Sequence, residues 1–153
     1  MGFETPSLKG RALKLLSQRE HSRLELERKL AKYEEEPGTL AQALDELGAR
    51  DFISEARVVE SVLHRRAARM GAARVRQELQ AKGIGDAAVA DAMEQLKATE
   101  WARAQAVWRQ RFGALPQDAG ERARQMRFLL ARGFSSTIAA RLLRVGLGDD
   151  DVA

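Results

Sequence analysis

The chain has 153 residues, of which 44% are hydrophobic and only 5% aromatic, and its net charge at pH 7 is +4. It contains no cysteine, which excludes disulfides and any thiolate nucleophile or metal ligand. The sequence shows neither the apolar stretch of a signal peptide nor a run of about 18 apolar residues, so we expect a cytoplasmic protein without a membrane span.

The first third of the sequence predicts three helices. Thr5-Pro6 suits a helix start, because threonine caps a helix and proline is tolerated at its first position. Ser22-Arg23-Leu24-Glu25 has the pattern of a capping box and predicts the start of a second helix. Pro37-Gly38 ends that segment, Thr39 is predicted to cap the third helix, and Gly48 to close it.

The middle third predicts the same plan. Asp51 or Ser54 begins a helix that ends near Gly71. The next helix leads to Gly83, which suits the left-handed turn that follows many helices. Asp86 is predicted to cap a third, shorter helix.

The last third again predicts three helices. The first begins at Thr99, ends at Gly113 and carries three aromatic residues that we assign to a core: Trp101, Trp108 and Phe112. Asp118-Ala119-Gly120-Glu121 resembles a second capping box, with aspartate as the cap. Ser135 or Ser136 caps the last helix.

Three stretches of similar sequence, at 27–30, 76–84 and 126–134, place leucines Leu30, Leu79 and Leu129 at intervals of 49 and 50 residues. A fixed period of this size indicates stacked supersecondary units. Since no segment alternates with period two, the sequence predicts an all-α fold. We predict three tandem three-helix, helix-turn-helix-like repeats at 5–50, 51–98 and 99–146. A frayed acidic tail is expected at 147–153.

Charge is distributed unevenly along the chain. The segment 20–60 has a net charge of −5, whereas 61–76 contains five arginines and no acid. These arginines are the main candidates for binding an anionic partner, either DNA phosphate or an acidic protein groove: Arg65, Arg66, Arg69, Arg74 and Arg76. Lys82, Arg127 and Arg132 complete the candidate set, although turn chemistry alone accounts for Lys82 and Arg132. A solvated helix surface is the alternative interpretation of these charges.

No pattern of catalytic residues is present in the sequence. His21 and His64 are expected to be surface residues, and neither a histidine pair with metal-binding spacing nor a glycine-rich phosphate loop occurs. We therefore predict a protein that is not an enzyme and that holds no cofactor or metal.

Six segments of the sequence resemble the RecX family, the bacterial regulators of the recombinase RecA. They are Ala12–Ser22, Glu27–Leu30, Leu44–Gly48, Phe52–Arg66, Gly71–Ile84 and Arg127–Phe134. The resemblance implies that the three repeats form an elongated, curved array. It also implies a monomer that docks in the helical groove of the RecA–DNA nucleoprotein filament. It implies inhibition of the ATPase, strand-exchange and coprotease activities of RecA, with a role in DNA recombination, DNA repair and the SOS response.

A direct DNA-binding module of the helix-turn-helix type is the competing hypothesis. It shares the basic clusters and the three-helix outline. Tight, steeply salt-dependent binding to single- or double-stranded DNA without recombinase would distinguish it. The net negative charge of 20–60 argues against a DNA track along the full length of the chain.

Overall fold

The computed structural model describes residues 5–145, and that part of the chain folds into nine α-helices and one 3₁₀ helix without a strand. The predicted tail at 147–153 lies outside the described residues. The helices are α1 Leu8–Gln18, α2 Arg23–Leu30, η1 (the 3₁₀ helix) Ala31–Tyr33, α3 Thr39–Ala49, α4 Glu55–Arg66, α5 Ala72–Ala81, α6 Asp86–Lys97, α7 Glu100–Arg111, α8 Ala119–Ala131 and α9 Ser136–Val145.

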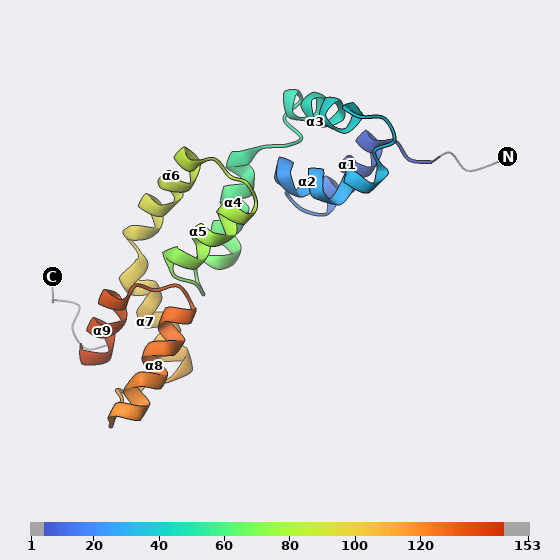
Figure 1. The fold of residues 1–153 in the computed structure, drawn as a ribbon. Helices are drawn as coiled ribbons and strands as arrows, with labels where there is room; N and C mark the ends of the chain where they lie inside the picture. Colours follow the sequence, from blue (N-terminus) through green and yellow to red (C-terminus); the bar gives the residue numbers. More distant parts are fainter. Residues whose placement is uncertain (1–4, 146–153) are drawn as a thin grey trace.

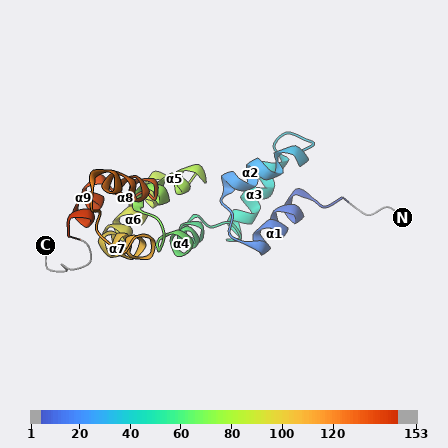
Figure 2. The same ribbon diagram turned by 90° about the horizontal axis from the view of Figure 1, so that it is seen from below.

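The helices form three consecutive groups, which we call the first (α1–α3), second (α4–α6) and third (α7–α9) repeats. Figure 1 shows the three repeats following one another along a bent row. In both views, α1 and α9 lie at opposite ends of this row (Figures 1 and 2). The prediction of an all-α, elongated and curved array of three-helix repeats is confirmed.

Each repeat has its own hydrophobic core. The first is built around Leu26 and Leu44, the second around Val62 and Leu79, and the third around Trp108, all of them at most 2% exposed. No buried cluster among residues 5–145 spans two repeats. The predicted core role of the aromatic residues is confirmed, since Trp101 and Phe112 pack against the same cluster as Trp108.

Side-chain caps begin several helices where the sequence places them. The capping box of Ser22 and Glu25 is complete, and Ser54 is the cap of α4. Asp118 accepts a hydrogen bond from the Glu121 N–H at 2.7 Å, as predicted. The second box is only half formed, however, because the Glu121 carboxylate accepts from the Gln117 N–H instead.

Some predicted helix ends are wrong. Ser7, not Thr5, caps α1, because its hydroxyl accepts the Gly10 N–H. Thr39 and Asp86 are the first residues of their helices, since glycines precede them at the cap positions.

Gly48 does not close α3, contrary to the prediction. Asp51 takes the left-handed conformation (φ 65°) in its place, and the Phe52 N–H bonds to the Leu47 carbonyl at 2.9 Å. Aspartate tolerates this conformation better than most residues with a side chain. The turn predicted at Gly83 is confirmed, with φ 75°.

The second helices of the three repeats, α2, α5 and α8, meet end to end. At the junction of the second and third repeats, the Gly71 N–H donates to the Arg132 carbonyl at 2.7 Å and the Ala73 N–H to the Gly133 carbonyl at 3.2 Å. A helix leaves its first N–H groups and last carbonyls without partners of its own. The end of α8 and the start of α5 therefore satisfy each other, with their dipoles aligned head to tail.

Two glycines permit this contact. A Cβ atom on Gly71 would lie 2.3 Å from the Gly133 carbonyl carbon, and one on Gly133 would lie 2.5 Å from the Arg74 backbone nitrogen. Because backbone atoms cannot rotate away as a flexible side chain can, any larger residue would separate the two repeats.

Arg103 on α7 strengthens the same junction from within. Its guanidinium donates to the carbonyls of Ala67 at 3.1 Å, Met70 at 2.6 Å and Leu96 at 3.0 Å. These carbonyls follow α4 or lie in the last turn of α6, where a cation is favoured. Burial lowers the pKa of Arg103.

Side chains, rather than paired backbones, hold the first junction. Lys82 forms an ion pair with Glu25 at 3.2 Å, and Arg57 forms one with Glu20 at 2.9 Å. The C-terminal end of α5 thus meets the N-terminal end of α2 through charged groups. In Figure 1 the first repeat stands apart, joined to α4 by an extended segment.

Candidate partner-binding surface

The predicted arginines lie on α4, on the turn after it and on α5, and all are exposed. Arg65 and Arg66 end α4, Arg69 lies in the turn, and Arg74 and Arg76 are in the first half of α5. Within residues 5–145, only Arg66 of these five has a carboxylate within 4 Å. The structure therefore leaves most of this charge free of internal neutralisation.

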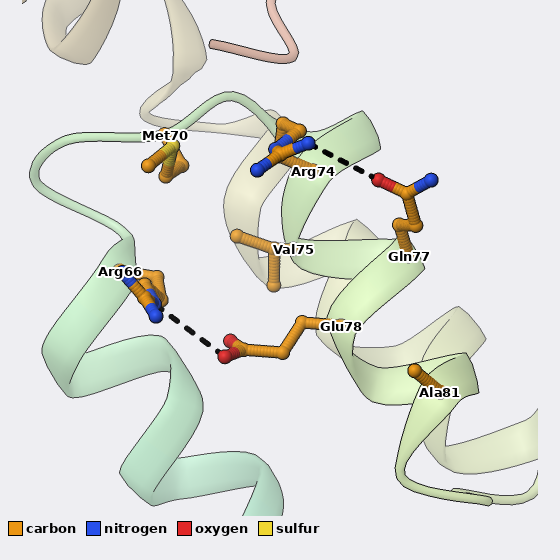
Figure 3. Close-up of a pocket in the computed structure, with 7 residues that line it drawn as sticks. All are labelled: Arg66, Met70, Arg74, Val75, Gln77, Glu78 and Ala81. Atoms are coloured by element: carbon orange, nitrogen blue, oxygen red, sulfur yellow. Dashed lines mark hydrogen bonds and ion pairs between the residues drawn. The ribbon is translucent and has the colours of Figure 1, made fainter.

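Arg66 and Arg74 line one groove between α4 and α5. Figure 3 shows both side chains beside Val75, with Glu78 reaching Arg66 across the groove. The Arg66–Glu78 distance is 3.4 Å, and Arg74 contacts the Gln77 amide oxygen at 3.5 Å. The volume of this groove, about 220 Å³, is below the usual range for small-molecule sites. The geometry suits surface contact better than capture of a substrate.

Arg69 belongs to a different cavity, which faces the third repeat and has a volume of about 380 Å³. Arg111, Phe128 and Arg132 also line it. The guanidinium carbon of Arg132 lies 4.9 Å from the Phe128 ring centroid, and that of Arg111 lies 5.6 Å from it. Both cations are therefore held near this ring by cation–π attraction. Of the five predicted arginines, Arg66 and Arg74 therefore line one concavity and Arg69 lines a second, whereas the other two line neither.

Sequence reasoning missed Arg111 and Phe128 as members of this second cavity. The signal in the sequence was weak, because they come from α7 and α8 and meet Arg69 only through the packing of the third repeat on the second. The arginine excess of the last third gave their residue type but not their location.

Lys82 is placed at the first junction. Its side chain is only 14% exposed and pairs with Glu25. Burial alone would raise the pKa of Glu25, but hydrogen bonds from Arg19, the Ser22 N–H and Lys82 outweigh burial and bring this pKa to about 2. Lys82 thus has an internal partner that competes with any external one.

Arg132 and Arg127 differ in their surroundings. Arg132 donates to the Arg69 carbonyl at 3.2 Å, so it links the third repeat to the second while lining the cavity. Arg127 lies exposed on α8 and lines neither concavity.

His21 is buried, with 1% exposure, so the prediction of a surface residue is wrong. Its Nδ1 lies 3.0 Å from the Arg19 carbonyl oxygen, which accepts a hydrogen bond from it, and its Nε2 lies 3.1 Å from Lys29 Nζ. Burial lowers the pKa of His21. The ring packs under the start of α2 and is not presented to a ligand.

No three His, Asp or Glu side chains between residues 5 and 145 gather as metal ligands would. None of the described helices combines the length and the apolar character needed to cross a membrane.

Comparison with known proteins accounts for all three repeats. The family descriptions "RecX, first three-helix domain", "RecX, second three-helix domain" and "RecX, third three-helix domain" match residues 9–47, 54–93 and 98–143. The chain belongs to the RecX family. The predicted resemblance is confirmed, and each matched range corresponds, within a few residues, to one of the observed repeats.

Relatives of similar length support this assignment. "Regulatory protein RecX" of Leptothrix cholodnii is 54% identical over 145 residues, covering 95% of this chain and 92% of the relative. The protein of the same name from Ralstonia nicotianae is 50% identical over 138 residues, covering 90% and 87%. A crystal structure of RecX from Lactobacillus salivarius shares the fold, with a TM-score of 0.69 and 21% identity, covering 90% of this chain and 92% of the other.

Proposed function

We propose that this RecX protein docks in the helical groove of the RecA–DNA filament and restrains ATP hydrolysis, strand exchange and coprotease activity. Family membership supports the partner, because RecX proteins are regulators of RecA, and supports a regulatory rather than a catalytic role. The observation that carries the mode of action is the elongated row of three repeats (Figures 1 and 2).

An elongated array suits a helical polymer for a physical reason. Repeats that contact neighbouring protomers bind as linked modules, so the second contact forms at a high effective concentration. A ligand that fits one spacing of the protomers better than another shifts the equilibrium between these spacings. The tight junction at Gly71 and Gly133 gives the second and third repeats a fixed relative position, as such a spacer requires.

The exposed arginines of the second repeat are the proposed contact with the filament. Arg65 and Arg76 are the most informative pair to change, because both are exposed and neither forms an ion pair within the described residues. Their charge is thus available to acidic protein surface or to DNA inside the filament.

Sedimentation of RecA filaments with bound protein tests this proposal. The double variant Arg65→Glu, Arg76→Glu should lose at least about tenfold in affinity, since long-range charge complementarity contributes to docking. Lys97→Glu with Arg122→Glu, also exposed and without ion pairs in residues 5–145, makes the same change in net charge elsewhere. Equal losses in both variants would indicate a general charge effect and refute the proposed contact.

A direct DNA-binding module remains the second candidate function. The observation that favours it is the set of second-repeat arginines without carboxylate partners. If it is correct, binding of the isolated protein to duplex DNA should depend on Arg65 and Arg76 and weaken steeply with salt. Undiminished duplex binding by the double variant would exclude it.

A further inference from the structure

A groove in the first repeat carries a concentration of positive charge that neither the predicted site nor the family comparison assigns. It has a volume of about 640 Å³. Five cationic residues line it, from three elements: Arg11 and Lys14 of α1, Arg28 and Lys29 of α2, and Lys32 of η1. Its lining contains no acidic residue.

The acids of the first repeat do not cancel this charge, because most of them have other partners. Six form ion pairs with bases outside the groove: Glu20, Glu25, Glu27, Asp45, Glu46 and Asp51. Glu34 accepts the Leu40 N–H at the start of α3. By contrast, none of the five groove cations has a carboxylate within 4 Å in residues 5–145. The net negative charge of 20–60 therefore gives a misleading picture of this face.

Two of the five cations make uncharged contacts, which leave their charge in place. Arg28 donates to the Ala81 carbonyl at 3.4 Å, and Lys29 lies 3.1 Å from the His21 ring nitrogen. Lys14 and Lys32 are exposed and make no ion pair in the described part of the chain. Arg11, Lys32 and Tyr33 also line a neighbouring cavity that contains Glu35 and Glu36, so the acid-free positive region ends at these three residues.

The floor and one end of the groove add a second kind of chemistry. Leu15, Leu30 and Ala31 supply apolar surface. Tyr33 is 39% exposed, and the Arg11 guanidinium carbon lies 3.7 Å from its ring centroid. A cationic groove with an exposed aromatic ring is the pattern of proteins that bind single-stranded nucleic acid, since phosphates meet the cations and unpaired bases stack on the ring.

We infer that this groove binds a single strand of nucleic acid, with phosphates along Lys14, Arg28, Lys29 and Lys32 and a base against the Arg11–Tyr33 pair. A duplex keeps its bases stacked inside and cannot use the tyrosine or the apolar floor. An acidic protein segment would meet the cations but would have no use for an exposed ring paired with arginine. This site is separate from the second-repeat arginines and does not depend on the proposed filament docking.

The test is binding of a fluorescently labelled oligothymidylate to the full chain without recombinase, followed by anisotropy. Four phosphate contacts on a single strand correspond to an affinity that falls about 50-fold between about 50 and about 200 mM salt. Lys14→Gln with Lys32→Gln removes two contacts, each worth about a factor of eight at about 50 mM salt, and should weaken binding about 60-fold. Tyr33→Ala should cost about tenfold, whereas Tyr33→Phe should retain most of the affinity.

Controls separate this site from the other surfaces and occupants. Lys97→Gln with Arg122→Gln, exposed cations outside both this groove and the proposed filament contact, should leave oligothymidylate binding unchanged, and thermal melting should confirm that every variant is folded. Wild-type affinity in the Lys14, Lys32 variant would overturn the inference. Equal affinity for duplex DNA would also overturn it. If polyglutamate competes as effectively as unlabelled oligothymidylate, the occupant is an acidic protein segment and the inference is again overturned.

Discussion

Replacing Gly71 by alanine should break the junction between the second and third repeats. The added Cβ would lie 2.3 Å from the Gly133 carbonyl carbon and 2.4 Å from the Phe134 nitrogen, where ordinary contacts begin at 3.4 Å. The two backbones must therefore move apart by about 1 Å. That movement weakens both inter-repeat bonds, from the Gly71 N–H to Arg132 and from the Ala73 N–H to Gly133.

The expected cost follows from these contacts. Two backbone hydrogen bonds at about 1 kcal/mol each, with about 1–3 kcal/mol of overpacking strain, give a loss of roughly 3–5 kcal/mol. If about 3 kcal/mol is lost from a chain of this size, the Tm should fall by roughly 6–12 °C. Inhibition of RecA should weaken as well, because the fixed position of the two repeats would be lost.

Circular dichroism at increasing temperature measures this effect. Gly48→Ala is the matched control, since a Cβ at Gly48 meets nothing within 4 Å and this residue lies inside α3. Alanine there should leave stability unchanged or raise it by about 0.5–1 kcal/mol. If Gly71→Ala melts within a degree or so of the parent chain, the close backbone contact is refuted.

Three further predictions concern ionisable side chains that are buried or half-buried. The pKa of Glu25 is about 2 in the folded chain, below its ordinary value of 4.5, so the unfolded chain takes up the proton first and stability should fall as the pH drops from about 5 toward 2. Glu25→Gln should flatten this part of a plot of urea midpoint against pH and should lose about 1–2 kcal/mol of stability at neutral pH. An unchanged plot would contradict this prediction. The lowered pKa of His21 likewise predicts that stability declines as the pH falls below about 6.5, with an NMR titration midpoint for His21 below that value; a midpoint above it would be inconsistent with burial. Arg103→Lys should lose about 2 kcal/mol by thermal unfolding, because lysine lacks the fork that reaches the Met70 and Leu96 carbonyls together, whereas Arg109→Lys, an exposed change on the same helix, should be neutral.

Local signals predicted most of the fold. The capping box at Ser22 and the left-handed turn at Gly83 depend only on residues close in sequence, and both are confirmed. Where a prediction of this kind failed, a nearby residue supplied the same chemistry. Asp51 took the left-handed position expected of Gly48, and Ser7 took the cap expected of Thr5.

The junctions could not be predicted in this way. The helix predicted to end near Gly71 ends at Arg66, and Gly71 is instead the N-cap of α5. Its close approach to Gly133 joins residues of different repeats. The local sequence around Arg103 likewise gives no sign that it will reach carbonyls at Ala67 and Met70. Such contacts depend on how whole repeats stack, and that is not encoded in any short pattern.

Charge sums along the sequence were the least reliable guide. The segment 20–60 is acidic overall, yet its acids pair with bases on other faces and leave a positive groove beside Tyr33. His21 was assigned to the surface for a related reason, because the sequence shows its polar neighbours but not the packing around α2. Spatial pairing decides both cases.

The ATPase of RecA on single-stranded DNA, titrated with this RecX protein, tests the central claim most directly. If an array of three repeats spans neighbouring protomers and holds them in one spacing, turnover should fall at a stoichiometric or lower ratio of RecX to RecA, and Gly71→Ala should require more protein for the same effect. Turnover that stays constant throughout the titration would contradict the account.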